Sequence, residues 1–528
     1  MPALPLSLPL DVYPATLVKQ IDAAAIAAGT PGVVLMKRAA RAALAQITQR
    51  YPNAPLWVVC GGGNNGGDGY VLAALAKAKG VDARVFFASN PAQLNNEAAE
   101  AYGFAAQEQV PMLPVEQLPE VAPKGVVIVD ALLGIGLSGC VRADMAALIT
   151  RLNQLSAPKV ALDIPSGLCA DTGQVLGAAI SAALTVCFVA LKPGLVTGRG
   201  PAFCGELLFD DLGIAPAHYP VAPVRRIDFA QCLPLLPRRA VDAHKGGSGH
   251  VLVVGGDVGL GGAGLLSSEA ALKVGAGLVS LATRAEHVLA SLVRRPEVMA
   301  AAVNTAADLA GLMAKASVIA CGPGLGQAPW GQQLYQAVLN AGKPLVLDAD
   351  GLNLLAKNTA GLSCPNPCVI TPHPAEAARL LGVTTLEVQQ DRIAAAKALA
   401  AKTGAVVVLK GAGTVVVSGE QVWIATVGNP MLATAGSGDV LCGLIAGLWA
   451  QLGDEGLSGL DAALLGVCLH GALADYLVAG AFVSGTFGQG LSYFGQGLSY
   501  GYSAADLVPQ LPALLAHTFG LLSQPVAV

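Results

Sequence analysis

Charged and aromatic side chains are both scarce in this chain. Aspartate, glutamate, lysine and arginine make up 12% of the 528 residues, against a typical value of about 25%, and aromatic residues make up 5%. The net charge is −4, from 31 basic and 35 acidic residues, which argues against a basic nucleic-acid tract or a polybasic membrane patch. The 54% of hydrophobic residues and the 64 glycines instead predict close-packed helices on buried strands.

Long apolar runs and targeting signals are also lacking. The best membrane candidate, residues 176–191, is shorter than the roughly 20 residues that a span needs, and we interpret it as a buried helix followed by a buried parallel strand. The N-terminal MPALPLSLPLDVYP has no basic segment followed by an apolar one, so no secretory signal is expected. Eleven scattered cysteines fit a reducing compartment. We therefore expect a cytoplasmic protein with no membrane partner and no nucleic-acid partner.

Short apolar, β-branched runs alternate with alanine-rich runs of helical length in two stretches, 14–215 and 240–520. This alternation predicts an α/β fold with parallel strands and helices on both faces of each sheet. Buried parallel strands read as continuous apolar runs, as these do. We expect two doubly wound, three-layer domains. The expected strands are 56–60, 84–87, 126–129, 159–162 and 184–189, and then 250–254, 278–281, 318–321, 345–347, 369–371 and 406–409.

A proline-rich stretch, 214–240, separates the two halves. Few of its positions are periodic, which is typical of a domain boundary. The predicted organisation is a first domain over 1–218, a linker over 219–239 and a second domain over 240–528. Small residues near 39–45 could pack across a subunit interface, and we expect a homo-oligomer.

A seven-residue segment, FGQGLSY, occurs twice in succession, at 487–493 and 494–500. One duplication is too short to define a repeat architecture. We interpret it as a duplicated surface loop that lies away from the motifs described below.

The first expected strand runs into a glycine-rich loop, GGGNNGGDG at 61–69. Three of its glycines fit the G-x-G-x-x-G fingerprint, but the second strand ends in FFASN and lacks the acidic residue that binds the ribose of a dinucleotide. Asn64, Asn65 and Asp68 lie among the glycines. They leave three interpretations open: an anion site made by backbone amides, oxygen ligands for a hard cation, or a plain turn.

Two further expected strands end in polar residues and glycines. Asp130 follows strand 126–129 and opens DALLGIGLSG, while Asp163 and Ser166 lie in DIPSGL after strand 159–162. A single aspartate at such a place is often only a helix cap. Because the carboxyl ends of neighbouring parallel strands meet at one edge of the sheet, where ligands bind, the three loops together predict a ligand site.

CGGGNNGGDG, VDALLGIGLSG and LDIPSGLCADTG together resemble the epimerase domain of NAD(P)H-hydrate repair proteins, over about the first 215 residues. The resemblance implies that hydrated cofactors, NADHX and NADPHX, bind here. It implies that Asp163 is the catalytic acid or base that interconverts the two epimers at C6. A potassium ion would be held by Asn65, Asp130 and Ser166. The residues implied in substrate binding are Asn64, Asn65, Gly66, Gly67, Asp68, Gly134, Ile135, Gly136, Leu137, Ser138, Gly139, Cys140 and Asp163.

The second half also places chemistry-bearing loops after its expected strands. His373 is fixed between two prolines in TPHPAE, and KGAGT follows strand 406–409. In AGSGD, the residues Gly436 to Gly438 lead into an expected helix whose first residues include Asp439. Free backbone amides and the helix dipole would form an anion site there. Asp439 lies beside it, where it could accept a proton from a hydroxyl that attacks a phosphoryl group.

The AGSGD loop resembles that of the ribokinase-like superfamily. With GPGLG, LDADGLNLL, TPHPAE and KGAGT it resembles, more narrowly, the ADP-dependent NAD(P)H-hydrate dehydratase domain, over about 240–515. The fold classes implied are therefore Rossmann-like for the first domain and ribokinase-like for the second. A magnesium ion bridging the phosphates is implied. The residues implied in nucleotide binding are Lys410, Gly411, Ala412, Gly413, Thr414 and Gly438, and those implied in substrate binding are Ala263, Gly322, Gly324, His373 and Asp439.

The two resemblances together imply metabolite repair. The S-hydrate would be phosphorylated on its C6 hydroxyl at the expense of ADP, with Asp439 as the base, and phosphate would then leave; the epimerase would supply the S form from the R form. The residues alone do not decide between ADP and ATP. Three alternatives stay open: a ribokinase-like small-molecule kinase with a regulatory first domain, an NAD-dependent dehydrogenase, and a ligand-binding protein without activity.

Overall fold

The computed structural model describes residues 8–237, 241–242, 244–358, 361–364, 366–451, 458–479 and 502–522. The chain forms two compact units, Met1–Arg226 and Ile227–Val528, and each is described by itself. The duplicated FGQGLSY segment at 487–500 lies outside the described residues.

A parallel sheet of order β4-β3-β2-β5-β6-β7-β8 is the centre of the first unit. The expected strands 56–60 and 159–162 are β2 and β6, at the expected bounds. The strands are β1 (Asp11–Val12), β2 (Leu56–Cys60), β3 (Ala83–Phe87), β4 (Met112–Pro114), β5 (Val127–Ala131), β6 (Lys159–Leu162), β7 (Leu184–Phe188), β8 (Glu206–Asp210) and β9 (Val224–Ile227). The helices are α1 (Ala15–Ala27), α2 (Gly32–Arg50), α3 (Asn64–Ala78), α4 (Asn96–Gln107), α5 (Ala143–Gln154), α6 (Pro193–Val196) and α7 (Gly200–Phe203).

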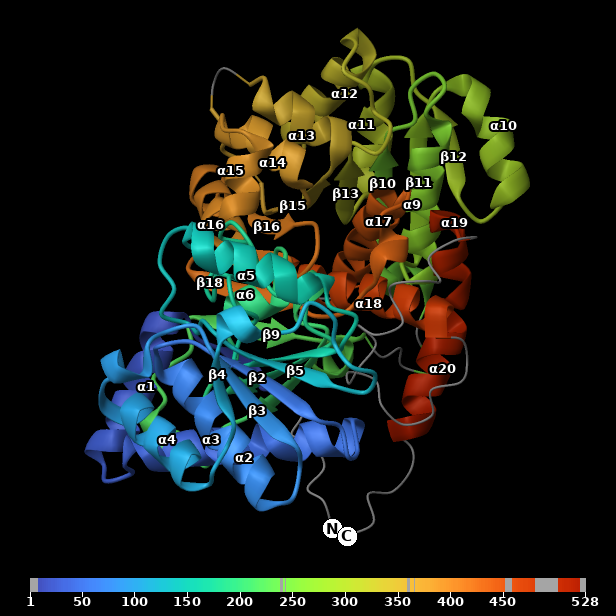
Figure 1. Ribbon diagram of the computed structural model, residues 1–528. Helices are drawn as coiled ribbons and strands as arrows, with labels where there is room; N and C mark the ends of the chain where they lie inside the picture. The colour runs from blue at the N-terminus through green and yellow to red at the C-terminus, as the bar shows by residue number, and fades with distance from the viewer. Residues whose placement is uncertain are drawn as a thin grey trace. The chain divides into compact units, whose positions relative to one another are not determined.

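Helices cover both faces of this sheet, as the alternating sequence predicts. Alternate residues of β2 point to opposite faces: Val58 packs with the buried side chains of α1 to α4, whereas Val59 packs with those of α5. Figure 1 shows α2, α3 and α4 on one side of the sheet and α5 on the other. The three-layer arrangement therefore brings the carboxyl ends of β2, β5 and β6 together at one edge.

The expected helix before β7 is wrong. Residues 176–183 form an irregular segment, and regular structure begins only at Leu184. The backbone of this segment bonds to neighbouring loops instead of to itself: the Leu176 amide donates to Gly167 at 2.9 Å and the Ile180 amide donates to Ser166 at 2.9 Å. Apolar character here reflects burial against the loop that carries Ser166, and not helix formation.

The second unit contains a sheet whose strands run in the order β18-β17-β16-β15-β14-β13-β10-β11-β12. The strands from β12 to β16 are parallel, and β17 and β18 add antiparallel pairs. The strands are β10 (His250–Val254), β11 (Leu278–Thr283), β12 (Met299–Ala302), β13 (Val318–Cys321), β14 (Leu345–Leu347), β15 (Cys368–Ile370), β16 (Val406–Leu409), β17 (Thr414–Ser418) and β18 (Gln421–Ala425).

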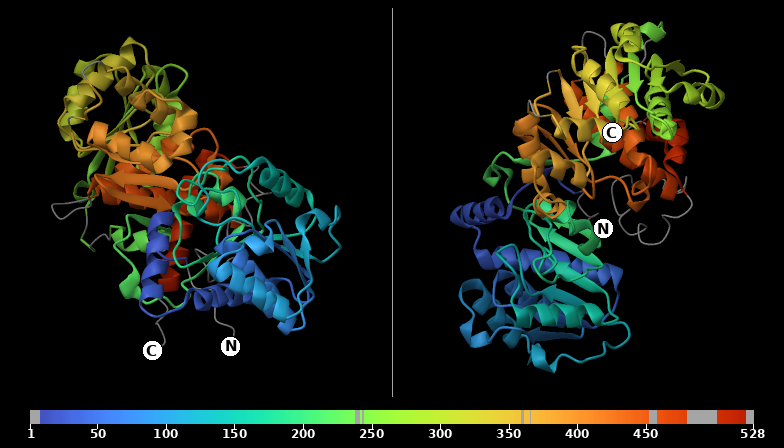
Figure 2. Two further views of the ribbon diagram at one scale, coloured as in Figure 1. Left: turned by 60° about the vertical axis from the view of Figure 1, so that its left-hand side comes forward. Right: turned by 90° about the horizontal axis from the view of Figure 1, so that it is seen from above.

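Helices pack on both faces of this second sheet too. Figures 1 and 2 show α11 to α16, coloured olive to orange, on the opposite side of the sheet from α9, α17 and α18. The helices are α8 (Phe229–Cys232), α9 (Gly261–Lys273), α10 (Ala285–Arg294), α11 (Ala306–Lys315), α12 (Pro329–Leu339), α13 (Ala349–Ala356), α14 (Pro374–Leu381), α15 (Thr385–Gln390), α16 (Arg392–Thr403), α17 (Ser437–Ala450), α18 (Gly459–Ala479), α19 (Ala504–Leu507) and α20 (Leu511–Leu522).

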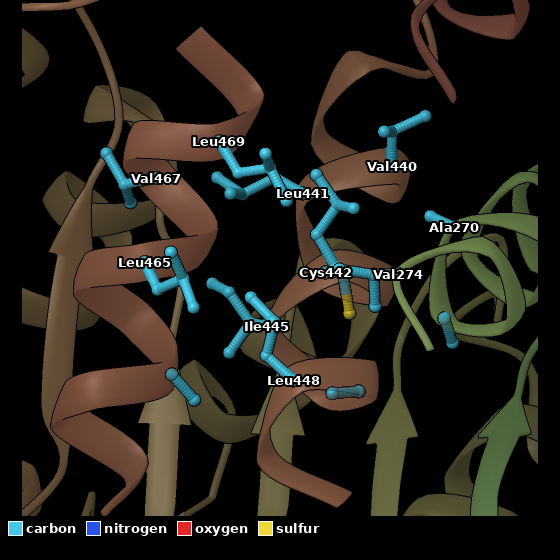
Figure 3. Close-up of a cluster of buried hydrophobic side chains, with 14 of the residues drawn as sticks. Ala270, Val274, Val440, Leu441, Cys442, Ile445, Leu448, Leu465, Val467 and Leu469 are labelled. Carbon is cyan, nitrogen blue, oxygen red and sulfur yellow. The ribbon is translucent and has the colours of Figure 1, made fainter. Parts of the chain in front are cut away.

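Helix α17 lies in the middle of the core of the second unit, between α9 and α18 (Figure 3). It is apolar on nearly all sides, as a fully buried helix must be. Glycine sets how closely it approaches α9: a Cβ on Gly443 would lie 2.0 Å from the Ser267 carbonyl oxygen, and one on Gly447 would lie 2.6 Å from that of Ala271. This contact fixes the position of the helix that begins with the AGSGD loop.

Helix α18 is the one described helix long and apolar enough to cross a membrane by composition. In the structure 78% of its most apolar window is buried, and its side chains belong to the core around α17. Burial in the unit accounts for its apolar sequence.

The expected linker contains regular structure, and part of helix α2 is buried. Within the expected linker, β9 pairs with β1, and α8 begins with a capping box made by Asp228 and Gln231. Ala40 and Ala43 of α2 are fully buried in the core of the first unit, whereas Ala45 is exposed. A subunit interface near 39–45 stays a prediction.

Candidate active sites

The glycine-rich loop after β2 is packed directly against the end of β5. A Cβ on Gly61 would lie 1.9 Å from the Leu132 carbonyl oxygen, and one on Gly66 would lie 2.1 Å from that of Gly61. No side chain fits at either position. Glycine thus lets the first turn of α3 approach the loop after β5, which brings the predicted binding residues Asn64 to Asp68 to the sheet edge.

Three predicted oxygen ligands come together at this edge. Ser166 donates its hydroxyl to Asp130 Oδ1 at 2.6 Å and its amide to Asp130 Oδ2 at 2.8 Å. The Leu133 amide donates to Ser166 Oγ at 2.8 Å, and Asn65 Nδ2 donates to the Leu133 carbonyl at 3.0 Å. Burial raises the pKa of Asp130 to about 6, against the lowering effect of the Ser166 bonds. Asn65 Oδ1 is buried without a hydrogen-bond partner.

Asp163 follows β6 in a left-handed backbone conformation, with φ of 64°, which turns its side chain back toward β7. Its Oδ1 accepts a hydrogen bond from the Phe188 amide at 3.0 Å and forms an ion pair with Lys192 Nζ. Lys192 is fully buried. Our sequence reasoning missed Lys192 as a site residue, although its place just after a strand of the same sheet is a usable signal.

Two more carboxyl groups interact with Asp163. Burial, then Asp163, raises the pKa of Asp22 to about 6. The pKa of Asp68 is raised well above its ordinary value by burial, then by Asp163 and Asp22. Asp68 was predicted in the binding loop, whereas Asp22, on α1, carries no motif that could identify it. The edge therefore holds one buried cation, Lys192, among three carboxyl groups.

The predicted loop from Gly134 to Cys140 begins against this cluster and ends in solvent. A Cβ on Gly134 would lie 3.3 Å from Asn65 Cβ, and residues 138–140 are exposed. The loop is therefore placed where it could contact a ligand bound at the sheet edge.

In the second unit, the GPGLG loop after β13 lies between the start of α9 and the start of α13. Gly322 has φ of 127°, and a Cβ there would lie 1.8 Å from the Asp348 carbonyl oxygen. A Cβ on Gly324 would lie 3.1 Å from Ala263 Cβ. The structure thus brings the predicted residue Gly324 against Ala263, and Gly322 against the start of α13.

Lys410 connects the KGAGT loop to the AGSGD loop. Its Nζ donates to Asp348 Oδ1 at 2.7 Å and lies 3.9 Å from Glu376 Oε2. A Cβ on Gly438 would lie 3.2 Å from Lys410 Nζ. Burial alone would lower the pKa of Lys410, but Asp348 and Glu376 raise it above its ordinary value. Asp348, which we did not predict as a site residue, is the buried partner of this ammonium group.

The rest of the KGAGT loop lies at the surface, next to the buried side chain of Arg392. Gly411 and Ala412 are exposed, and Arg392 Nη2 donates to the carbonyls of Leu409 at 3.1 Å and Lys410 at 3.2 Å. Burial lowers the pKa of Arg392 to about 10. Arg392, which lies in an ordinary helical run, gave no sequence signal.

His373 caps α14 with Glu376. Its Nδ1 accepts from the Ala375 amide at 3.1 Å, and the Glu376 carboxylate accepts from the His373 amide at 2.8 Å. Burial, then Lys410 and Arg379, lowers the pKa of His373, and burial raises that of Glu376 to about 7. The lowered pKa favours the neutral imidazole of His373. This side chain lies beside Lys410, and about half of its surface is exposed.

The AGSGD turn has the predicted geometry. Gly436 is the N-cap of α17 with φ of 87°, and Asp439 is the third residue of the helix. Burial, then Asp348, raises the pKa of Asp439 to about 6, against the lowering effect of Lys410. A carboxyl group, an ammonium group and the first turn of a helix therefore lie close together.

The buried side chain of His470 contacts this turn. Ser437 Oγ lies 3.2 Å from His470 Nε2, and burial lowers the pKa of His470 to about 4. His470 lies in the apolar helix α18, so nothing in its sequence context points to the site.

These features define the class: an α/β protein with a cluster of polar side chains at the strand ends of each unit, the second of which joins an ammonium group and carboxyl groups to a helix start. A model for NAD(P)H-hydrate dehydratase matches residues 251–491, and a model for the YjeF-related protein N-terminus matches 32–194. The bifunctional NAD(P)H-hydrate repair enzyme of Coxiella burnetii is 45% identical over 88% of this chain and 94% of its own. That of Escherichia coli is 43% identical over 90% and 91%.

A solved ADP/ATP-dependent NAD(P)H-hydrate dehydratase from Bacillus subtilis, co-crystallised with ATP and Mg²⁺, is 30% identical, with a TM-score of 0.45. That match covers 54% of this chain and 96% of the other. The relatives in C. burnetii and E. coli span both units. The chain belongs to the family of bifunctional NAD(P)H-hydrate repair enzymes.

Proposed function

We propose that this chain restores NADH and NADPH from their hydrates by two activities. Residues 1–218 interconvert the R and S forms of NADHX and NADPHX, and residues 240–528 dehydrate the S form at the expense of ADP, releasing AMP and phosphate. The dehydratase assignment rests on one observation: Lys410, Asp348 and the Gly438 backbone lie close together beside Asp439. Such an arrangement suits transfer of a phosphoryl group, because donors and an anion-binding turn are fixed in advance.

The dehydration proceeds in two steps. The C6 hydroxyl oxygen attacks the β-phosphorus of ADP, the bond to AMP breaks, and Asp439 accepts the hydroxyl proton. The carbon–oxygen bond then breaks, with phosphate as the leaving group and the ring nitrogen supplying electrons, and the adjacent carbon loses a proton. Lys410 and the amides of the 436–439 turn hold the transferring group. Phosphate leaves where hydroxide would not, which is why a nucleotide is consumed.

The binding residues follow from the same geometry. Lys410, Gly411, Ala412, Gly413, Thr414 and Gly438 are assigned to the nucleotide, and the exposed KGAGT backbone above Arg392 supports this. Ala263, Gly322, Gly324, His373 and Asp439 are assigned to the hydrated dinucleotide. The close approach of Gly324 to Ala263 supports a flat ligand lying against backbone.

In the first unit Asp163 is assigned as the catalytic acid or base at C6, and Asn64 to Asp68 with the Gly134–Cys140 loop as the substrate-binding residues. Potassium fits Asn65, Asp130 and Ser166, because Asn65 Oδ1 is a buried oxygen without a partner and all three are hard oxygen donors. When bound there, potassium supplies positive charge that orders the loops around the substrate.

Magnesium is assigned to the dehydratase site, where it would neutralise charge on the nucleotide phosphates. Among the described residues no three His, Cys, Asp or Glu side chains converge as metal ligands. Mg²⁺ in phosphoryl-transfer sites is held largely by phosphates and water, so the nucleotide itself would supply most of its ligands.

The cellular setting is part of the proposal. Eleven free cysteines support a cytoplasmic location, and the weak net charge of −4 supports small-molecule partners without nucleic acid or membrane. Exposed apolar side chains on α10, namely Leu289 and Val293, which are 71% and 79% exposed, support a homo-oligomer. Light scattering of the purified chain tests the assembly.

The function is tested by incubating purified protein with mixed NADHX epimers, ADP and magnesium while the absorbance of the reduced ring is followed. Wild type should restore the full absorbance. Asp163→Ala should restore the S fraction and then only what spontaneous epimerisation provides, and Asp439→Ala should restore none. Full recovery without any nucleotide would contradict the proposal, and a stable phosphorylated product without restored absorbance would identify a small-molecule kinase instead.

A further inference from the structure

Lys192 is fully buried in the first unit, and its contacts hold its ammonium group in one place. Nζ forms an ion pair with Asp163 Oδ1, donates to the Phe188 carbonyl at 2.8 Å and lies 3.5 Å from Cys187 Sγ. Burial alone would lower the pKa of Lys192, but Asp163 and then Cys187 raise it above its ordinary value. The group is therefore a fixed cation that cannot reach a substrate itself.

Asp163 is held by the same small set of atoms. Its Oδ1 accepts from both the Phe188 amide and Lys192 Nζ, and within the described residues these are the hydrogen bonds that its carboxylate makes. The Asp163 side chain keeps 16% of its surface exposed. The left-handed backbone at Asp163 is a strained conformation for a residue with a side chain, which indicates that this orientation matters.

The surroundings of Asp163 disfavour a second negative charge. Asp22 on α1 and Asp68 on α3 both interact with it, and the pKa of each is raised, first by burial and then by Asp163. Cys187 also faces the pair. Lys192 opposes the upward pKa shifts of Asp22 and Asp68, so its ammonium group is the counter-charge of this cluster of carboxyl groups.

We propose that Lys192 is a positioning residue of the epimerase site, whose ammonium group holds the Asp163 carboxylate in place and turned toward C6 of the substrate. The inference rests on the proposed epimerase activity of the first unit. A buried Lys–Asp pair could instead serve stability alone, and the experiment must separate these two roles.

The test measures kcat and KM for epimerisation of the R epimer by the full chain, with dehydration of purified S epimer as an internal control in the same protein. Lys192→Met should lower kcat by up to about 10²-fold, the cost of misplacing a reacting group by about 1 Å, and should change KM little. Lys192→Arg, which keeps a cation beside Asp163, should retain more of the wild-type kcat than Lys192→Met. Dehydration should be unchanged in both.

Lys159→Met is the matched control. Lys159 is also a buried lysine of the first unit, but it lies at the opposite end of β6, where its Nζ donates to the Leu155 carbonyl at 2.6 Å. Its replacement should lower stability without lowering the epimerase kcat. A wild-type kcat for Lys192→Met, or one equal to that of Lys159→Met, would overturn the inference.

A second variant keeps the inference testable if Lys192→Met does not fold. Lys192→Gln keeps a hydrogen-bond donor near the Phe188 carbonyl but removes the charge, so its epimerase kcat should lie below that of Lys192→Arg. Equal kcat values for these two variants would contradict the role assigned to the ammonium group. Absence of R-to-S conversion in wild type would refute the proposed epimerase function itself, an outcome distinct from an active wild type whose variants keep its kcat.

Discussion

At the scale of single residues, the two sites use charge in different ways. In the first, one ammonium group, Lys192, is paired with one of three neighbouring carboxyl groups. In the second, Lys410 is paired with Asp348 and lies beside the AGSGD turn, while Asp439 keeps a raised pKa of about 6. Such a carboxylate is ionised at neutral pH and is still basic enough to accept a proton from an alcohol.

Replacing Asp439 by Asn should abolish dehydration while leaving epimerisation intact. The amide cannot accept the proton, and loss of a general base costs about 10²–10⁴ in rate. In wild type, kcat/KM for dehydration should rise with pH through about 6, because the pKa of Asp439 is raised to about 6 and only the ionised form is the base. Dehydration by Asp439→Asn within tenfold of wild type would contradict the assignment.

The residues that sequence reasoning missed share a physical cause. Motifs identify Asp163, Ser166, His373 and Asp439, because a loop with glycines or prolines shows where backbone must approach a ligand. Lys192 and Arg392 act from buried positions, and His470 acts from inside an apolar helix. Their roles depend on which segments the fold places opposite them, and a single sequence does not contain that information.

At the scale of elements, both sites are made by short loops at the ends of parallel strands, with helix starts packed against them. Helix α17 carries Asp439 into place because Gly443 and Gly447 let it lie against α9. The bounds of β2, β6 and β10 could be predicted, since buried parallel strands are continuous apolar runs. The irregular 176–183 segment was wrongly predicted to be a helix for the same reason. It is apolar because much of it is buried, and its sequence therefore resembles that of a buried helix.

Gly443→Ala should test the close packing of α17 on α9. The added Cβ would lie 2.0 Å from the Ser267 carbonyl oxygen, and overpacking of this kind costs about 1–3 kcal/mol. Denaturant unfolding should show the loss, and dehydration should fall more than epimerisation because Asp439 starts the same helix. The matched control is Gly311→Ala on α11, where nothing lies within 4 Å of the new Cβ. Equal stability of the two variants would refute the packing argument.

At the scale of the whole molecule, two compact units carry separate sites on one chain. The fold class of each unit could be predicted, because alternating strand and helix patterns leave few other architectures. The added antiparallel strands β17 and β18 and the folded β9–α8 segment were not predicted, because a pattern of strands that alternate with helices leaves no place for a hairpin or for a strand inside a linker.

Separate sites predict complementation between two inactive variants. Asp163→Asn alone should recover the S fraction of a mixed hydrate, and Asp439→Asn alone should recover nothing. An equimolar mixture should recover the full absorbance, because epimerised substrate released by one chain can be dehydrated by another. Recovery that stops at the S fraction in the mixture would mean that both aspartates must act in the same chain.

The central claim is that the C6 hydroxyl leaves as part of a phosphate. It is tested most directly with S-NADHX carrying ¹⁸O in that hydroxyl, incubated with the protein, unlabelled ADP and magnesium. Because the hydroxyl oxygen attacks phosphorus before the carbon–oxygen bond breaks, the released inorganic phosphate should carry one ¹⁸O per NADH formed. Unlabelled phosphate, with the ¹⁸O in water, would contradict the account.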